Sequence, residues 1–164
     1  MRVLISPLSG SSGWPNTRGV PTSRPMQLVR LSFDRAKRNG FAERFYSAFL
    51  ASDPAIRAKF RHTNFDRQRD LLIHGVYSML DYEEERAMGK LALERLSKLH
   101  GRGRLDVPPW MYQRWLDCFV ETLWKADPEM DAALAAAWRR ALGPGIALMT
   151  EAHRASGEGE RMRG

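Results

Sequence analysis

Cysteine is almost absent from this chain of 164 residues, and Cys118 is the only one. A disulfide within the chain and a cysteine-based metal cluster are therefore excluded, and a reducing, cytoplasmic location is expected. No apolar run approaches the roughly 20 residues that a membrane-spanning helix needs, so no membrane association is expected. The alternation of apolar and polar residues that marks strands is also missing, which predicts an all-α fold.

Acidic residues are fewer than basic ones, and the net charge of +7 is a reason to consider nucleic acid as a partner. Arg2, Arg18 and Arg24 contribute positive charge within a leading segment that has no acidic residue. The other charges are spread around amphipathic helices, whereas a DNA-binding face would concentrate basic residues. We therefore expect no nucleic-acid partner.

The chain divides into a leader, one domain and a tail. Residues 1–25 are rich in serine, glycine and proline without apolar periodicity, which predicts a disordered leader. Met26 lies where the periodic sequence begins and is a usable start. One folded domain is expected over 26–154, a length that can bury a sizeable core. A frayed tail is expected over 155–164.

Helix start signals recur along the domain. Asp53-Pro54 and Asp127-Pro128 each place a capping aspartate before a proline, which is well suited to the first position of a helix. The expected helices are 27–38, 41–52, 54–60, 64–80, 87–100, one that begins after 106–109 and one that begins at 127.

The first expected helix is amphipathic, and its periodicity turns Leu28 and Leu31 inward. Phe33 or Ala36 fits the same face less regularly.

One face of the 87–100 helix carries Gly89, Leu93, Leu96 and His100, because these residues are spaced three or four apart. A neutral imidazole at its end could offer one ring nitrogen to a metal, while a carbonyl of the previous turn holds the other. A haem is flat, apolar and has a metal centre that needs such a ligand. From spacing alone, a core histidine bonded to backbone is the more common explanation.

Other segments decide between these two readings. The run FYSAFLASDPAIRAKF at 45–60, Gln68 with Leu72 one turn later, and VPPWMYQRWLDCF at 107–119 occur in fixed order around His100. In order and spacing, these motifs make residues 27–150 resemble the bacterial single-domain globins, which are similar to the globin domain of flavohaemoglobins without the reductase. The resemblance implies the globin fold, with helices A, B, C, E, F, G and H packed around a haem b pocket.

The resemblance also implies roles for single residues. His100 would be the axial ligand to iron, the usual proximal arrangement in globins. Tyr46 and Gln68 would donate hydrogen bonds to bound O₂ from the opposite side. The residues that would hold the haem itself are Phe60, Leu72, Val76, Leu96 and Tyr112.

The expected function is reversible binding of O₂, and of CO and NO, at ferrous iron, as in oxygen transport; no catalytic residue is assigned. One alternative is an NO dioxygenase with an external reductase, and another is a haem-based gas sensor that acts through a partner. A haem-free helical interaction module is the third. Flavohaemoglobins pair the proximal histidine with a tyrosine and a glutamate. Tyr112 could be that tyrosine, whereas Glu151, the nearest glutamate in the last helix, does not align cleanly.

Overall fold

The computed structural model describes residues 22–101 and 104–161, and within them every regular element is a helix, which confirms the all-α class. The helices are α1 (Arg24–Arg38), α2 (Phe41–Ser52), α3 (Pro54–Lys59), α4 (Phe65–Glu83), α5 (Ala87–His100), α6 (Pro109–Ala126) and α7 (Ala132–Arg161). None of the helices in these residues is long and apolar enough to cross a bilayer.

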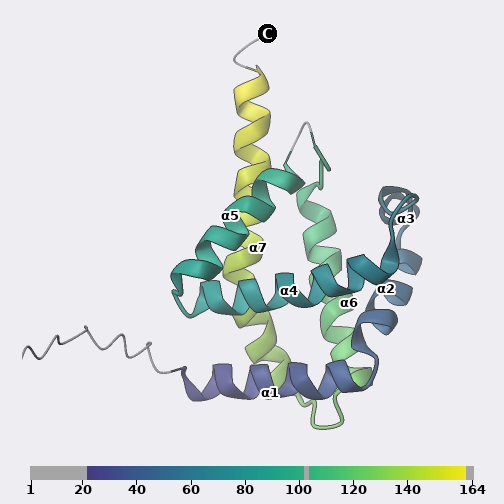
Figure 1. Ribbon diagram of the computed structural model, residues 1–164, viewed down its shortest axis with the longest axis vertical. Helices are drawn as coiled ribbons and strands as arrows, with labels where there is room; N and C mark the ends of the chain where they lie inside the picture. The colour runs from purple at the N-terminus through teal and green to yellow at the C-terminus, as the bar shows by residue number, and fades with distance from the viewer. Residues whose placement is uncertain (1–21, 102–103, 162–164) are drawn as a thin grey trace, which may run out of the picture.

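The long helix α7 is the element on which most of the others pack. It runs along the long axis of the molecule with α6, while α1 and α4 cross that direction (Figure 1). Helices α1, α4, α5 and α6 all contact α7, and α2 packs against α6. The connection between α4 and α5 is short, so these two helices lie against each other and form the most extensive helix pair.

An aromatic cluster forms the centre of the core where α1, α2, α6 and α7 meet. Phe33, Phe41 and Phe119 are completely buried, and the rings of Phe41 and Phe119 meet edge to face at 4.8 Å. Trp138 of α7 packs on the rings of Phe33 and Phe119, and its indole Nε1 donates a hydrogen bond to Ser32 Oγ at 3.0 Å. Because each such side chain stabilises the fold by about 1.5–3 kcal/mol when buried, this cluster fixes α1 on α7.

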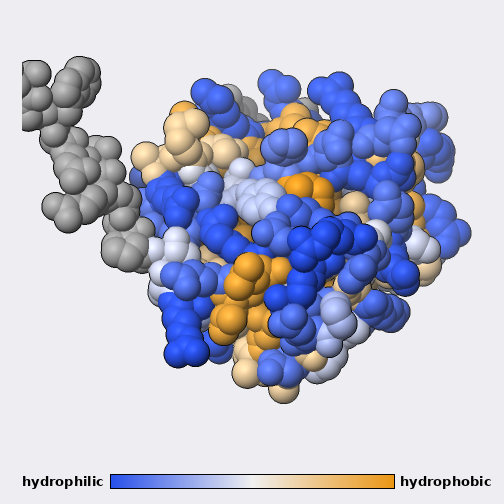
Figure 2. Space-filling view, turned by 60° about the horizontal axis from the view of Figure 1, so that its bottom comes forward, coloured by the Kyte–Doolittle hydropathy of each residue, from blue (hydrophilic) through white to orange (hydrophobic). Residues whose placement is uncertain are grey.

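The inward face predicted for α1 is wrong at Leu28 and Leu31 and confirmed at Phe33 and Ala36. Leu28 and Leu31 are 51% and 54% exposed, whereas Val29 and Phe33 are completely buried. The helix is rotated because the aromatic cluster accepts Phe33. Figure 2 views this end of the molecule, where apolar side chains interrupt a largely charged surface. The helix also begins at Arg24, before the predicted position, with Pro25 in its first turn.

The last helix begins at Ala132 and not at the predicted Asp127. Asp127 is buried, and its carboxylate accepts two hydrogen bonds from Arg35 of α1, at 2.6 and 2.9 Å. Asp131 takes the capping role instead, since its side chain accepts from Leu134 N at 2.7 Å. Asp127 also accepts from Glu129 N at 3.1 Å, so it closes a turn before the helix while it binds Arg35.

Two of the predicted boundaries fall partly outside the described residues. Residues 1–21 of the predicted leader lie outside them, and Thr22 and Ser23 lead directly into α1. At the other end α7 continues through the predicted tail as far as Arg161, and residues 162–164 lie outside the description. Asp53 caps α3 as predicted, accepting from Ala55 N at 2.7 Å.

Candidate functional site

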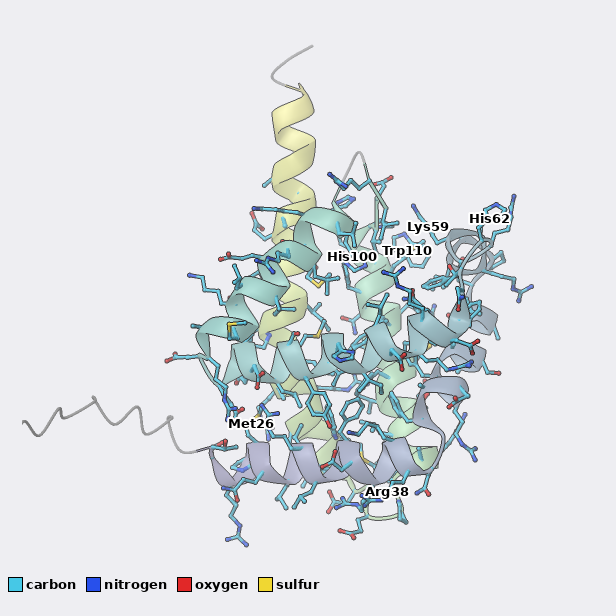
Figure 3. All side chains as sticks on the ribbon, in the orientation of Figure 1. Met26, Arg38, Lys59, His62, His100 and Trp110 are labelled. Carbon is cyan, nitrogen blue, oxygen red and sulfur yellow. The ribbon has the colours of Figure 1, made fainter. Side chains whose placement is uncertain are left out.

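The candidate site is framed by α4 and α5. Gln68 lies in the first turns of α4, far from the turn that joins α4 to α5. His100 is the last residue of α5 and lies at the opposite end of that helix from the same turn (Figures 1 and 3). At that turn the helices touch through Gly89, where a Cβ atom would lie only 2.5 Å from the backbone nitrogen of Tyr82. A glycine is therefore needed where the two helices converge.

His100 is largely removed from solvent at the end of α5. Burial lowers the pKa of its imidazole below the ordinary 6.5, and the carbonyl of Leu96 one turn earlier offsets part of this effect. The Nδ1 atom is nevertheless buried without a hydrogen bond of good geometry. The ring is therefore neutral at physiological pH and keeps a lone pair, which is the state that a metal ligand requires.

Tyr112 of α6 lies beside this imidazole. The two ring centres are 6.3 Å apart and the ring planes are perpendicular. Burial raises the pKa of the Tyr112 phenol to about 12, and its hydroxyl is buried without a hydrogen-bond partner among the described residues. Buried polar atoms without partners are costly in a helical core. His100 and Tyr112 each bury a polar atom without a partner among the described residues, and they lie side by side. This arrangement fits the wall of a binding site better than an ordinary apolar core.

A second polar pair joins α2 to α4. The side-chain amide of Gln68 donates to the Tyr46 hydroxyl oxygen at 3.0 Å. That hydroxyl in turn makes only a long contact of 3.4 Å to the backbone carbonyl of Gln68. Burial raises the pKa of Tyr46 to about 12, so the phenol stays protonated. Because its oxygen already accepts a good hydrogen bond while its proton makes a poor one, Tyr46 can donate to a third group.

Aromatic rings hold Tyr46 in place. Phe60, which follows α3, and Phe65, which begins α4, meet its ring edge to face at 5.8 and 5.5 Å, and Phe45 does so at 5.2 Å. Sequence reasoning did not assign Phe65 to the site. Its position three residues before Gln68 on the same helical stripe is the signal that could have found it.

The predicted site residues fall into two groups. The structure brings Tyr46, Gln68 and Phe60 together as one group, and His100 and Tyr112 as another. The other residues predicted to hold a haem are apolar: Leu72 and Val76 are buried in the core, and Leu96 is half-buried against it.

The remaining histidines lie apart from these groups. His62 and His74 are exposed, and His74 Nδ1 lies 2.8 Å from the Asp70 carbonyl oxygen. His153 of α7 is buried, and its Nε2 lies 3.0 Å from a carboxylate oxygen of Asp106. Its sequence position near the expected frayed end gave no sign of this contact.

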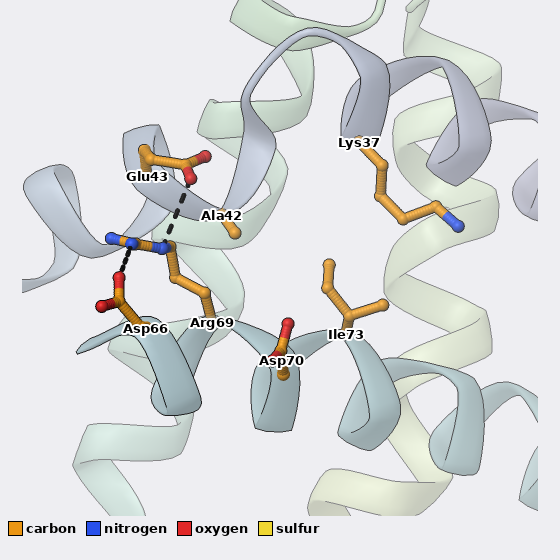
Figure 4. Close-up of a pocket in the computed structure, with 7 residues that line it drawn as sticks. All are labelled: Lys37, Ala42, Glu43, Asp66, Arg69, Asp70 and Ile73. Carbon is orange, nitrogen blue, oxygen red and sulfur yellow. Dashed lines mark hydrogen bonds and ion pairs between the residues drawn. The ribbon is translucent and has the colours of Figure 1, made fainter. Parts of the chain in front are cut away.

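A separate groove of about 420 Å³ lies on another face of α4 (Figure 4). It is lined mostly by charged side chains, with Ala42 and Ile73 as the apolar part, and Arg69 in its wall already pairs with Glu43 and Asp66. It presents no aromatic residue and no histidine. The groove therefore does not suit a flat apolar cofactor.

Comparison with known proteins adds an independent observation. The family model described as globin matches residues 43–147. A solved protein structure from Pseudomonas aeruginosa PAO1, described as structurally highly homologous to a human hemoglobin, shares 35% sequence identity with a TM-score of 0.75. The similarity covers 79% of this chain and 98% of that one. Among curated proteins, none matches this chain.

Proposed function

Since this chain belongs to the globin family, we propose that it is a haem protein that binds O₂ reversibly, with His100 as the axial ligand and Tyr46 as the hydrogen-bond donor to the gas. The hydrogen bond from the Gln68 amide to the Tyr46 hydroxyl, at 3.0 Å, carries the O₂ assignment. It fixes the phenol in the orientation in which its own proton is left for a ligand.

The residues around the proposed site have separate tasks. Haem, when bound, would supply the iron to which the gas binds. His100 offers a neutral ring nitrogen, and burial keeps it neutral. Leu72 and Val76 would exclude water from the haem because both are buried and apolar. Phe60 packs against Tyr46 and would border the haem next to that residue.

The pair formed by Tyr46 and Gln68 favours O₂ over CO. Bound O₂ is a more polar acceptor than CO, so a phenol proton stabilises it more strongly. A hydrogen bond to a charged or strongly polar acceptor contributes about 1.5–3 kcal/mol. The side-chain amide of Gln68 donates to the Tyr46 oxygen, so it acts on the gas through the phenol.

The proximal side does not favour the NO dioxygenase alternative. That chemistry is associated in flavohaemoglobins with a glutamate and a tyrosine that both pair with the proximal histidine. Here the Glu151 side chain is 74% exposed and pairs with Arg154 at 3.9 Å. The buried hydroxyl of Tyr112 has no hydrogen-bond partner in the described part of the chain. The gas-sensor alternative gains no specific support either, and binding of O₂ remains our proposal.

The decisive test is the replacement His100→Gly in the full-length protein. We expect the purified variant to lose its haem, and to regain a haem spectrum when imidazole is added, because free imidazole can fill the space of the missing ring. His62→Gly is the matched control, since His62 is exposed. Equal haem content in both variants and the parent, measured by absorption spectroscopy, would show that His100 is not the ligand.

A further inference from the structure

The segment that follows His100 folds back onto the end of α5. Val107 N donates to the His100 carbonyl at 3.0 Å, and Leu105 N donates to the Leu99 carbonyl at 3.2 Å. Asp106 N reaches the Gly101 carbonyl at 3.1 Å. We call residues 104–107 the α5–α6 strap. Because the strap supplies donors for the last carbonyls of α5, its position and the backbone of His100 move together.

Side chains from two other helices hold this strap. The Lys59 ammonium donates to the carbonyls of Leu105 and Asp106, at 2.9 and 2.7 Å. From the other side His153 of α7 contacts the Asp106 carboxylate at 3.0 Å. Asp106 itself has a positive φ of 46°, a conformation that L residues adopt only when neighbouring contacts impose it. The strap is therefore fixed in one conformation from outside.

Lys59 links this strap to the opposite wall of the candidate site. It is the last residue of α3 and immediately precedes Phe60, whose ring packs against Tyr46. Figure 3 shows Lys59 on the side of α3 that faces His100 and Trp110. A single side chain thus connects the backbone next to the Tyr46 group with the backbone next to His100.

We propose that Lys59 is a positioning residue for the proximal histidine: by anchoring the α5–α6 strap to α3, it sets the orientation of the His100 ring. This inference rests on the proposed function, because the orientation of His100 matters only if His100 binds haem iron. The hydrogen bonds of Lys59 are part of the fold itself. A lysine suits the task because its ammonium carries three donors and can serve two carbonyls at once. Lys59 is exposed, so the anchor tunes the site and does not decide whether the chain folds.

The test compares Lys59→Met, which keeps the length of the side chain without its donors, with Lys59→Arg, which restores donors. Lys125→Met, on an exposed lysine of α6, controls for the loss of one positive charge. In the haem-free chain we expect the Val107 amide to exchange with solvent about three- to tenfold faster in Lys59→Met, and at the parent rate in the other two. Unchanged exchange in Lys59→Met would overturn the anchor.

The haem-bound protein gives a readout that general destabilisation would not move. The iron–histidine stretching band, recorded by resonance Raman spectroscopy after photolysis of CO, reports the orientation of the imidazole. We expect this band to shift or broaden in Lys59→Met and to return in Lys59→Arg. A band identical to the parent in Lys59→Met would refute the positioning role, even if the strap had loosened.

One competing role for Lys59 is an ion pair with a carboxylate of the haem. Haem dimethyl ester has no free carboxylate, so it separates the two roles. If the band change in Lys59→Met persists with the ester, the strap is responsible; if the change disappears, the carboxylate is the partner and the proposal fails. A protein that binds no haem would disprove the proposed function, while the exchange of Val107 would still decide on the anchor.

Discussion

Replacing Tyr46 with phenylalanine is the sharpest test of how this protein would hold O₂. The change removes one oxygen and leaves the ring, which Phe45, Phe60 and Phe65 hold edge-on. The aromatic packing should therefore survive in Tyr46→Phe. What is lost is the phenol proton, together with the acceptor for the Gln68 amide at 3.0 Å.

The expected change in the rate of O₂ release follows from the free energy that the hydrogen bond from the phenol contributes. A hydrogen bond to a strongly polar acceptor contributes about 1.5–3 kcal/mol, and each 1.4 kcal/mol corresponds to about a factor of ten. We expect O₂ to leave Tyr46→Phe about 10- to 100-fold faster than the parent. The Gln68 side chain, freed from the phenol, can donate to the gas in its place, which favours the lower end of that range. CO should be released less than about threefold faster, since its hydrogen bond is worth little.

The assay is stopped-flow mixing of the oxygenated ferrous protein with a reductant that removes free O₂, repeated for CO by displacement with NO. The matched variant is Gln68→Leu, which removes the amide and keeps the phenol. If Tyr46 is the direct donor, its replacement should accelerate O₂ release more than Gln68→Leu does. Equal acceleration for O₂ and CO in Tyr46→Phe would refute the hydrogen-bond argument, because a steric change acts on both gases alike.

Two further predictions concern the haem-free chain and its packing. Because burial lowers the pKa of His100 in the folded state, the unfolded chain binds more protons at mildly acidic pH. The free energy of unfolding should therefore fall as the pH drops below 6.5 and level off below the folded pKa. His100→Gln should lack this part of the pH dependence in urea titrations, and an identical slope in both proteins would contradict it. Gly89→Ala should destabilise the fold by about 1–3 kcal/mol, because its Cβ would meet backbone atoms at 2.5 and 2.6 Å. Gly75→Ala, with nothing within 4 Å, should instead be neutral or slightly stabilising, and equal thermal shifts in the two would argue against the close approach.

Local periodicity predicted the parts of this fold that are built from neighbouring residues. The face of α5 from Gly89 to His100 follows directly from spacings of three and four, and Leu93 on it is completely buried. The cap at Asp53 could be predicted because its donor is only two residues away. The partnership of Tyr46 and Gln68 came from the family resemblance, since no local rule joins α2 to α4.

Contacts between distant segments were not predictable in the same way. The period of α1 predicted that Leu28 and Phe33 both face inward. Only Phe33 does, because an aromatic cluster assembled from three other helices accepts its ring. Asp127 accepts from Glu129 N as a capping aspartate would, but its ion pair with Arg35, far earlier in the chain, could not be predicted. The role of Lys59 could not be predicted, because nothing within α3 reveals the carbonyls that it binds.

The hydrogen bond between Trp138 and Ser32 joins positions 106 residues apart. During synthesis on the ribosome, Phe33 can meet Phe41 of the next helix early, but its contact with Trp138 must wait until that segment has left the exit tunnel. The chain can therefore pack its first two helices together early and attach them to α7 only late in translation. Chaperones can act on the exposed side of this helix pair during that interval.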